Sequence, residues 1–198
     1  MKIRIVVLLI GLMAFPVLAQ QVDRSPDAVA LAREAQMKSR ARGAKINSNS
    51  EEYQVLLSVR AAKRLSHEQP EQTLARMSGN NLIETKGSFV VFDAPQQSHA
   101  SVTTVNGASS YPTVLNARTG GIGVIPGTID VKLKNIDSAS VVAADHGLDV
   151  VRIFKHLNTA FYRVKSGQDV VAAATSLGRD TRVENAEVEI IEHVYVPN

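Results

Sequence analysis

The chain has 198 residues, with 22 Lys and Arg against 19 Asp and Glu, and it contains no cysteine. Without cysteine it has no thiol nucleophile, no thiolate metal ligand and no disulfide framework. Only 5% of its residues are aromatic and its charges form no basic stripe, so the composition argues against nucleic-acid binding.

The first 19 residues have the pattern of a secretory signal peptide. Met1 to Arg4 is a short basic start, Ile5 to Leu12 is apolar, and small or aliphatic residues lead to Ala19. We therefore expect cleavage between Ala19 and Gln20 and a periplasmic or secreted protein. The segment is too short for a transmembrane anchor, and no later segment approaches membrane length.

Residues 20–125 are expected to form a small domain or an extension with two helices and a few strands. Ser25-Pro26 is typical of a helix start, because serine caps the end and proline fits the first helical position. Ser48-Asn49-Ser50 is interpreted as the cap of a second helix with an apolar face. The expected elements are helices over 28–42 and 51–65, a further turn or two of helix over 70–77, strands over 82–84, 88–92 and 113–118, a loop over 95–112 and a turn or linker over 119–123.

Residues 126–198 are expected to form a second, α+β domain. Period-two alternation predicts the strand over 128–134, β-branched residues predict the strand over 149–154, and apolar residues at helical spacing predict the helices. The expected elements are strands over 128–134, 149–154 and 159–164, helices over 137–146 and 168–177, and a last strand with a tail over 183–196. This βαββαβ order defines a ferredoxin-like unit, in which four antiparallel strands carry two helices on one face and leave the other face free for docking.

Two stretches of this second domain, Gly147 to Phe161 and Leu177 to Glu189, resemble the N-terminal propeptides of subtilisin-like serine proteases. The resemblance covers about residues 127–195 and is strongest in the order of elements and in the step from Val183 to Glu189. No protease domain follows in this chain. The chain is therefore similar to the external chaperones of secreted kexin-like serine proteases, which also carry an extra region before a propeptide-like domain.

The resemblance implies a function and a set of contact residues. The protein would assist folding of its protease and hold it inactive, as one half of a heterodimer. Glu187 and Glu189 match the two acids that cap helix N-termini on the protease. Tyr195 matches the final propeptide residue, beside the catalytic serine. The expected protease-binding residues are Glu187, Glu189, Glu192, His193, Val194, Tyr195, Val196, Pro197 and Asn198.

The tail suits an inhibitor that adds a strand to the edge of a protease cleft. No Lys or Arg follows Arg182, so a cleft that selects basic side chains would cut the tail poorly. Pro197 further restricts the backbone and lacks an N–H group. The alternatives are a frayed terminus for the tail and a solvated strand face for the two acids.

The inventory of reactive residues predicts no enzyme, metal or cofactor. The five histidines are scattered, at positions 67, 99, 146, 156 and 193, without the spacing of a zinc site. The stretch from Gly120 to Gly123 lacks the Lys-Ser/Thr of a phosphate-binding loop. Lys63-Arg64 is interpreted as the exposed end of a helix rather than as a dibasic cleavage site for a kexin-like protease. Besides the chaperone, two functions stay open: a periplasmic protease inhibitor with no folding role, and a secreted interaction module.

Overall fold

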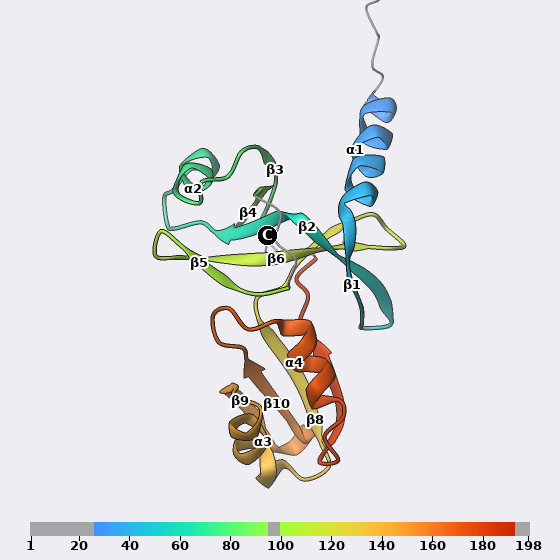
Figure 1. The fold of residues 1–198 in the computed structure, drawn as a ribbon, viewed down its shortest axis with the longest axis vertical. Coiled ribbons are helices and arrows are strands. Elements are labelled where there is room, and N and C mark those ends of the chain that lie inside the picture. The colour runs from blue at the N-terminus through green and yellow to red at the C-terminus, as the bar shows by residue number, and fades with distance from the viewer. Residues whose placement is uncertain (1–25, 95–99, 193–198) are drawn as a thin grey trace, which may run out of the picture.

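The computed structural model describes residues 26–94 and 100–192, which form two antiparallel β-sheets with helices packed on them (Figure 1). The α+β class expected from the sequence is confirmed. The expected signal peptide (1–19) and most of the expected tail (193–198) lie outside the described residues. No helix in the described ranges is long and apolar enough to cross a membrane.

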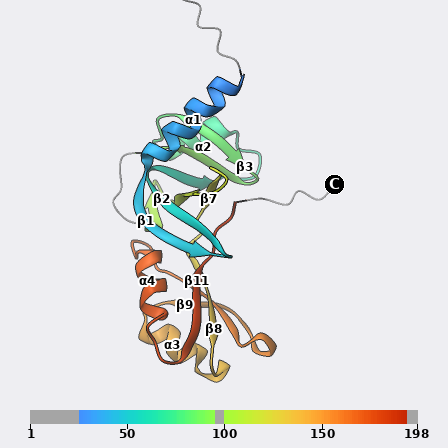
Figure 2. The same cartoon turned by 90° about the vertical axis from the view of Figure 1, so that its right-hand side faces the viewer.

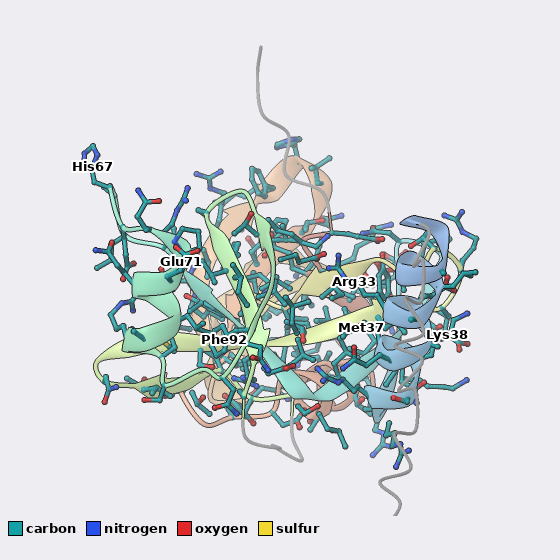
Figure 3. The ribbon with its side chains drawn as sticks, turned by 90° about the horizontal axis from the view of Figure 1, so that it is seen from above. Arg33, Met37, Lys38, His67, Glu71 and Phe92 are labelled. Carbon is teal, nitrogen blue, oxygen red and sulfur yellow. The ribbon has the colours of Figure 1, made fainter. Side chains whose placement is uncertain are left out.

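The first helix is present as expected. It is α1 (Pro26–Arg40), and its Met37 is buried at 4% exposure against the sheet. Arg33 of this helix binds Glu84 at 2.6 Å, while Lys38 pairs with Glu34 along the helix. Figure 3, from above, shows Arg33, Met37 and Lys38 on α1 and Phe92 on the sheet beside it.

The expected second helix over 51–65 is wrong, because these residues form strand β2 (Glu51–Lys63). Asn49 and Ser50, interpreted as a helix cap, have φ of 51° and 63° and turn the chain from β1 (Ala41–Ser48) into β2. Positive φ at both central residues is what a two-residue hairpin turn requires. Strand β2 pairs with β1 at its start. It also pairs with β4 (Phe89–Asp93) and with β6 (Ala108–Asn116).

The other elements of the N-terminal region agree in part with expectation. Helix α2 (Pro70–Arg76) and strands β3 (Leu82–Lys86) and β4 (Phe89–Asp93) lie where they were predicted. The predicted loop over 95–112 instead contains β5 (Thr103–Val105) and the start of β6 (Ala108–Asn116), and the predicted linker contains β7 (Ile122–Val124). The strand β5 and the first residues of β6 are polar and lack a clear apolar period. They are joined at Asn106 and Gly107, whose φ values are 48° and 76°.

The first sheet has seven strands among the described residues. Its order is β3-β4-β2-β6-β5, with β1 paired to β2 and β7 paired to β6. The charged residue Arg60 lies inside this sheet at 2% exposure. Its guanidinium donates to the carbonyl oxygens of Ser101 (2.7 Å) and Ser110 (2.6 Å) and to the Ser110 hydroxyl (3.1 Å). Arg60 therefore holds strand β2 to the chain that leads into β5.

The second sheet follows the predicted elements closely. It contains β8 (Thr128–Leu133), β9 (Asp149–Phe154), β10 (Thr159–Arg163) and β11 (Val183–Val188), with helices α3 (Ala139–Asp145) and α4 (Val170–Leu177). Its order is β11-β8-β10-β9 and all its pairs are antiparallel. The final strand ends earlier than predicted, at Val188. Short 3₁₀ turns, Ile136–Ser138 and Lys155–Leu157, precede α3 and β10.

The caps of this unit show why its elements could be predicted. The Asp169 carboxylate accepts a hydrogen bond from Ala172 N at 2.9 Å and begins α4. Asn135 caps the turn before α3, because its side-chain oxygen accepts a hydrogen bond from Asp137 N at 3.0 Å. Gly147 has φ of 66° after α3, the conformation expected for a residue that ends a helix.

One hydrophobic core joins the two sheets. Residues from the first sheet, such as Val55 and Val114, belong to the same buried cluster as Ile129 and Tyr162 of the second. The tip of the β1–β2 hairpin also reaches the second sheet (Figure 2), where the Ser48 hydroxyl donates to Val188 O at 3.0 Å. The Ala100 amide donates to Asp169 at 3.1 Å. These contacts hold the second sheet in a defined position below the first.

Candidate protein-binding surface

One face of the second sheet is covered by helices and the other is not. Helices α3 and α4 pack over β9, β11 and β8. On β8, Ile129, Val131 and Leu133 are buried toward these helices, whereas Asp130 is half-buried and Lys132 is exposed. Since neighbouring strand residues point to opposite faces, Asp130 and Lys132 lie on the uncovered face. We call this face the open face.

An aromatic cluster lies on the open face, across strands β9 and β10. Phe154 and Phe161 are half-buried and meet edge to face, with ring centroids 5.6 Å apart. The guanidinium carbon of Arg152 lies 5.4 Å from the Phe154 centroid, within range of a cation–π contact. None of these three residues was among the binding residues expected from the sequence. Strand alternation could have found Phe161, because it points to the opposite face from its neighbours Ala160 and Tyr162. Both neighbours are buried, so Phe161 lies on the open face.

Three carboxylates come together on the same face beside the aromatic cluster. Glu187 of β11 lies directly opposite Asp130 of β8. Burial raises the pKa of the Asp130 carboxyl, and the nearby charges of Glu187 and Glu189 raise this pKa further. The two acids chosen from the sequence therefore lie together, and Asp130 is a third that sequence reasoning missed.

Glu187 already has partners within the chain. One carboxylate oxygen accepts from the Asn49 amide at 3.2 Å, at the tip of the β1–β2 hairpin, and the other accepts from the Asn185 side chain at 2.8 Å. These bonds orient the carboxylate along the open face. Glu189 is fixed through its backbone, which donates to Thr128 O at 3.0 Å. Contact of either acid with another protein stays a prediction.

Replacing Asp130 by asparagine should stabilise the free protein at neutral pH. The folded-state pKa of Asp130 is raised above 3.8, so its charged form opposes folding at any pH above that raised pKa. Removing the charge should raise the free energy of unfolding by about 0.2–1 kcal/mol, the range for cross-strand charge pairs. This gain in stability should vanish below the pKa that Asp130 has in the unfolded chain, because the carboxyl is then protonated in both the folded and the unfolded state.

Urea titrations of wild type and Asp130→Asn at pH 7 and pH 3 measure this difference. Asp137→Asn is the control, since Asp137 is exposed and lies outside the sheet. Equal stabilities at pH 7, or a loss in the variant, would show that the three carboxylates do not repel one another.

The residue that begins the predicted tail is held by the first sheet. Glu192 Oε2 accepts from the Tyr53 hydroxyl at 3.0 Å and from the Asn116 amide at 3.1 Å, and Oε1 accepts from the Thr119 hydroxyl at 3.0 Å. The Lys86 ammonium donates to Glu192 O at 3.0 Å. The structure thus gives Glu192 an internal role. Its predicted contact with a protease is untested, and His193, Val194, Tyr195, Val196, Pro197 and Asn198 lie outside the described residues.

A Ser-His-Asp cluster joins the ends of α3 and α4, although no such group was expected from the sequence. His146 lies 3.2 Å from the Ser176 hydroxyl and 3.1 Å from Asp180. Arg182 binds both oxygens of Asp180 and holds the pKa of that carboxyl well below its usual range. Since Arg182 already neutralises the aspartate, the cluster fits a structural link better than an activated nucleophile. Within 26–94 and 100–192, no three His, Asp or Glu gather in a way that could hold a metal ion.

The fold and its open face define an α+β protein whose most distinctive surface is suited to docking. The family model described as "Open reading frame 2 N-terminal domain" matches residues 33–197, so the chain belongs to that family. No curated protein matches the chain.

One solved structure matches, entitled "Crystal structure of aeromonas sobria serine protease (ASP) and the chaperone (ORF2) complex". The match has 25% sequence identity and covers 50% of this chain and 100% of the other, with a TM-score of 0.37. A superposition of that quality transfers no geometry to this chain.

Proposed function

We propose that this protein is a trans-acting folding chaperone and inhibitor of a secreted serine protease of the subtilisin or kexin type. The proposal starts from the resemblance of Gly147 to Phe161 and Leu177 to Glu189 to subtilisin propeptides. Membership in the open reading frame 2 family agrees with it, since the chaperone in the Aeromonas sobria complex carries the same designation. The partner would bind as the second half of a heterodimer.

The observation that carries the proposal is the open face of the second sheet. The strand order β11-β8-β10-β9, with α3 and α4 on one side, supports a ferredoxin-like arrangement like that of the propeptides. Phe154 and Phe161 supply apolar area for an interface core. The carboxylates of Asp130, Glu187 and Glu189 repel one another in the free protein, and unpaired N–H groups at helix N-termini of a partner would relieve that repulsion.

The tail would supply the inhibitory half of the activity. Residues after Glu192 would enter the cleft as an added strand, with main-chain hydrogen bonds giving affinity. A protein that binds only the folded protease stabilises that state by mass action. Folding assistance and inhibition would therefore come from one docked complex.

We also propose that residues 20–125 are an extension or small domain that precedes the domain 126–198, in a secreted or periplasmic protein whose residues 1–19 are a signal peptide. The gap between Val124, where β7 ends, and Thr128, where β8 begins, supports the boundary. The shared core means that the first domain stabilises the second, which alone would have a small core.

Co-expression with the partner protease tests the function. The protease would be produced alone, with the full-length protein, and with a variant whose residues 195–198 are replaced by Gly and Ser. Soluble protease, and its activity after the complex is dissociated, would be measured. We expect active protease only where the full-length protein is present. Active protease formed alone but blocked by this protein would leave simple inhibition, and no effect of any kind would leave a secreted interaction module.

A further inference from the structure

We propose that the first sheet contains a positioning site for the C-terminal tail. This tail cradle is made of Tyr53, Lys86, Asn116, Thr119, Gly121 and Gly123, and it seats the residues Ile190 to Glu192. Its role is to fix the point and direction in which the tail leaves the protein. The inference rests on the proposed function, because it explains how the tail is aimed at the cleft of a protease.

The hydrogen bonds of the cradle converge on the Glu192 carboxylate. Tyr53 and Asn116, which donate to it, are only 6% and 1% exposed. The Asn116 side chain is itself oriented, because its oxygen accepts from the amides of Arg118 (2.9 Å) and Thr119 (3.0 Å). Its nitrogen is thereby turned toward Glu192. Donors that are oriented in advance hold a carboxylate in one position.

The glycines after Thr119 make room for the same segment. A Cβ atom on Gly121 would collide with Glu192 Oε1, and one on Gly123 would lie 2.5 Å from the Ile190 side chain. A side chain at Gly121 would therefore displace the Glu192 carboxylate from its donors, and one at Gly123 would crowd the Ile190 side chain. These glycines belong to the stretch 120–123, for which the sequence predicts only a turn or linker.

The backbone of the segment is bonded to both sheets. Val124 and Ile191 exchange two hydrogen bonds of 2.9 Å, and the Glu189 amide donates to Thr128 O in the second sheet at 3.0 Å. The Lys86 ammonium holds the last described carbonyl, that of Glu192. The segment is thus fixed relative to the open face as well as to the first sheet.

Fixing this segment has a direct consequence for binding. A peptide that leaves a docked protein at a defined point has a high effective concentration at a nearby cleft. Ordering its first residues in advance also removes part of the entropy cost of binding. The cradle therefore gives the first sheet a part in inhibition without any contact between that sheet and the protease.

Glu192→Ala and Gly121→Ala test the cradle, with Glu184→Ala as the matched control. Glu184 lies on β11, the strand that leads into the terminal segment, but it is exposed and pairs with Lys132. Each variant and a deletion of Tyr195–Asn198 would be assayed for inhibition of the folded protease. Binding to the same protease with a covalent peptide inhibitor in its cleft would be measured in parallel. Thermal unfolding checks that each variant folds. If Gly121→Ala does not fold, Glu192→Gln takes its place as the second cradle variant.

We expect both cradle variants to raise the inhibition constant about tenfold, a loss of about 1.4 kcal/mol. Their affinity for the blocked protease should stay within about twofold of wild type, since the open face is unchanged. If deletion of the tail weakens inhibition while Glu192→Ala does not, the cradle is wrong and the proposed function stands. If full-length and tail-deleted proteins both fail to inhibit, the proposed function is overturned and the cradle with it.

Discussion

Replacing Arg60 by leucine is expected to lower the free energy of unfolding by about 2–6 kcal/mol, because two buried carbonyl oxygens lose the guanidinium donors that they accept from. Among the described residues, Arg60 is the largest side chain that is fully buried, and burial lowers the pKa of its guanidinium to about 10, so it stays charged at neutral pH. Leucine would leave the Ser101 and Ser110 carbonyls without these donors. Each buried acceptor left unpaired costs about 1–3 kcal/mol.

The loss should extend beyond the first sheet. Ser101 forms a β-bridge with Asp169, the residue that caps α4. Arg60 therefore supports the joint between the two sheets as well as strand β2. Urea unfolding followed by far-UV circular dichroism measures the change, with Arg179→Leu as the control at an exposed arginine of the second unit. A difference below about 1 kcal/mol, within the range of ordinary surface substitutions, would show that the network is dispensable.

Replacing Phe161 by alanine is expected to weaken the complex with the protease by about 2 kcal/mol or more, which is about thirtyfold in Kd. Phe161 lies on β10 near the centre of the open face, between Asp130 on one neighbouring strand and Arg152 on the other. Aromatic residues in such central positions dominate interface energetics. In the free protein the side chain is half-buried, so most of the loss should appear in binding.

The affinity for protease with a blocked cleft is the measurement, because it isolates docking of the open face from insertion of the tail. Val141→Ala is the matched control, since Val141 is 55% exposed on α3, on the covered side of the same sheet. Both variants should unfold at temperatures close to that of wild type. An affinity change below about threefold for Phe161→Ala would remove the open face from the proposed interface.

Local signals account for the second unit, whereas tertiary pairing decides strand β2. In the second unit β8 alternates in polarity, β9 is rich in β-branched residues, and Asp169 and Gly147 lie at helix ends, so local residues suffice to predict β8 to β11 and both helices. Residues 51–65 carry apolar side chains that satisfy a helical period as well as a strand. Pairing with β1, β4 and β6 selected the strand, and no local window contains those partners.

The residues of the candidate surface also differ in whether the sequence or only the tertiary structure reveals them. The resemblance of the last strand to propeptides is enough to select Glu187 and Glu189 from the amino-acid sequence. Asp130 joins them only through the register of β8 with β11, in which it lies opposite Glu187. Its place at the start of the tail made Glu192 a partner-binding candidate, whereas its bonds to Tyr53, Asn116 and Thr119 come from residues more than 70 positions away along the chain.

The sequence by itself determined the α+β class and the order of elements in the second unit. These depend on side-chain period, caps and turn residues, all of which act within a few positions along the chain. Only the tertiary structure decided that residues 51–63 form a strand, that Arg60 is buried and that Glu192 is held by the first sheet. Each of these depends on hydrogen bonds between distant segments, and such bonds form only when folding brings those segments together.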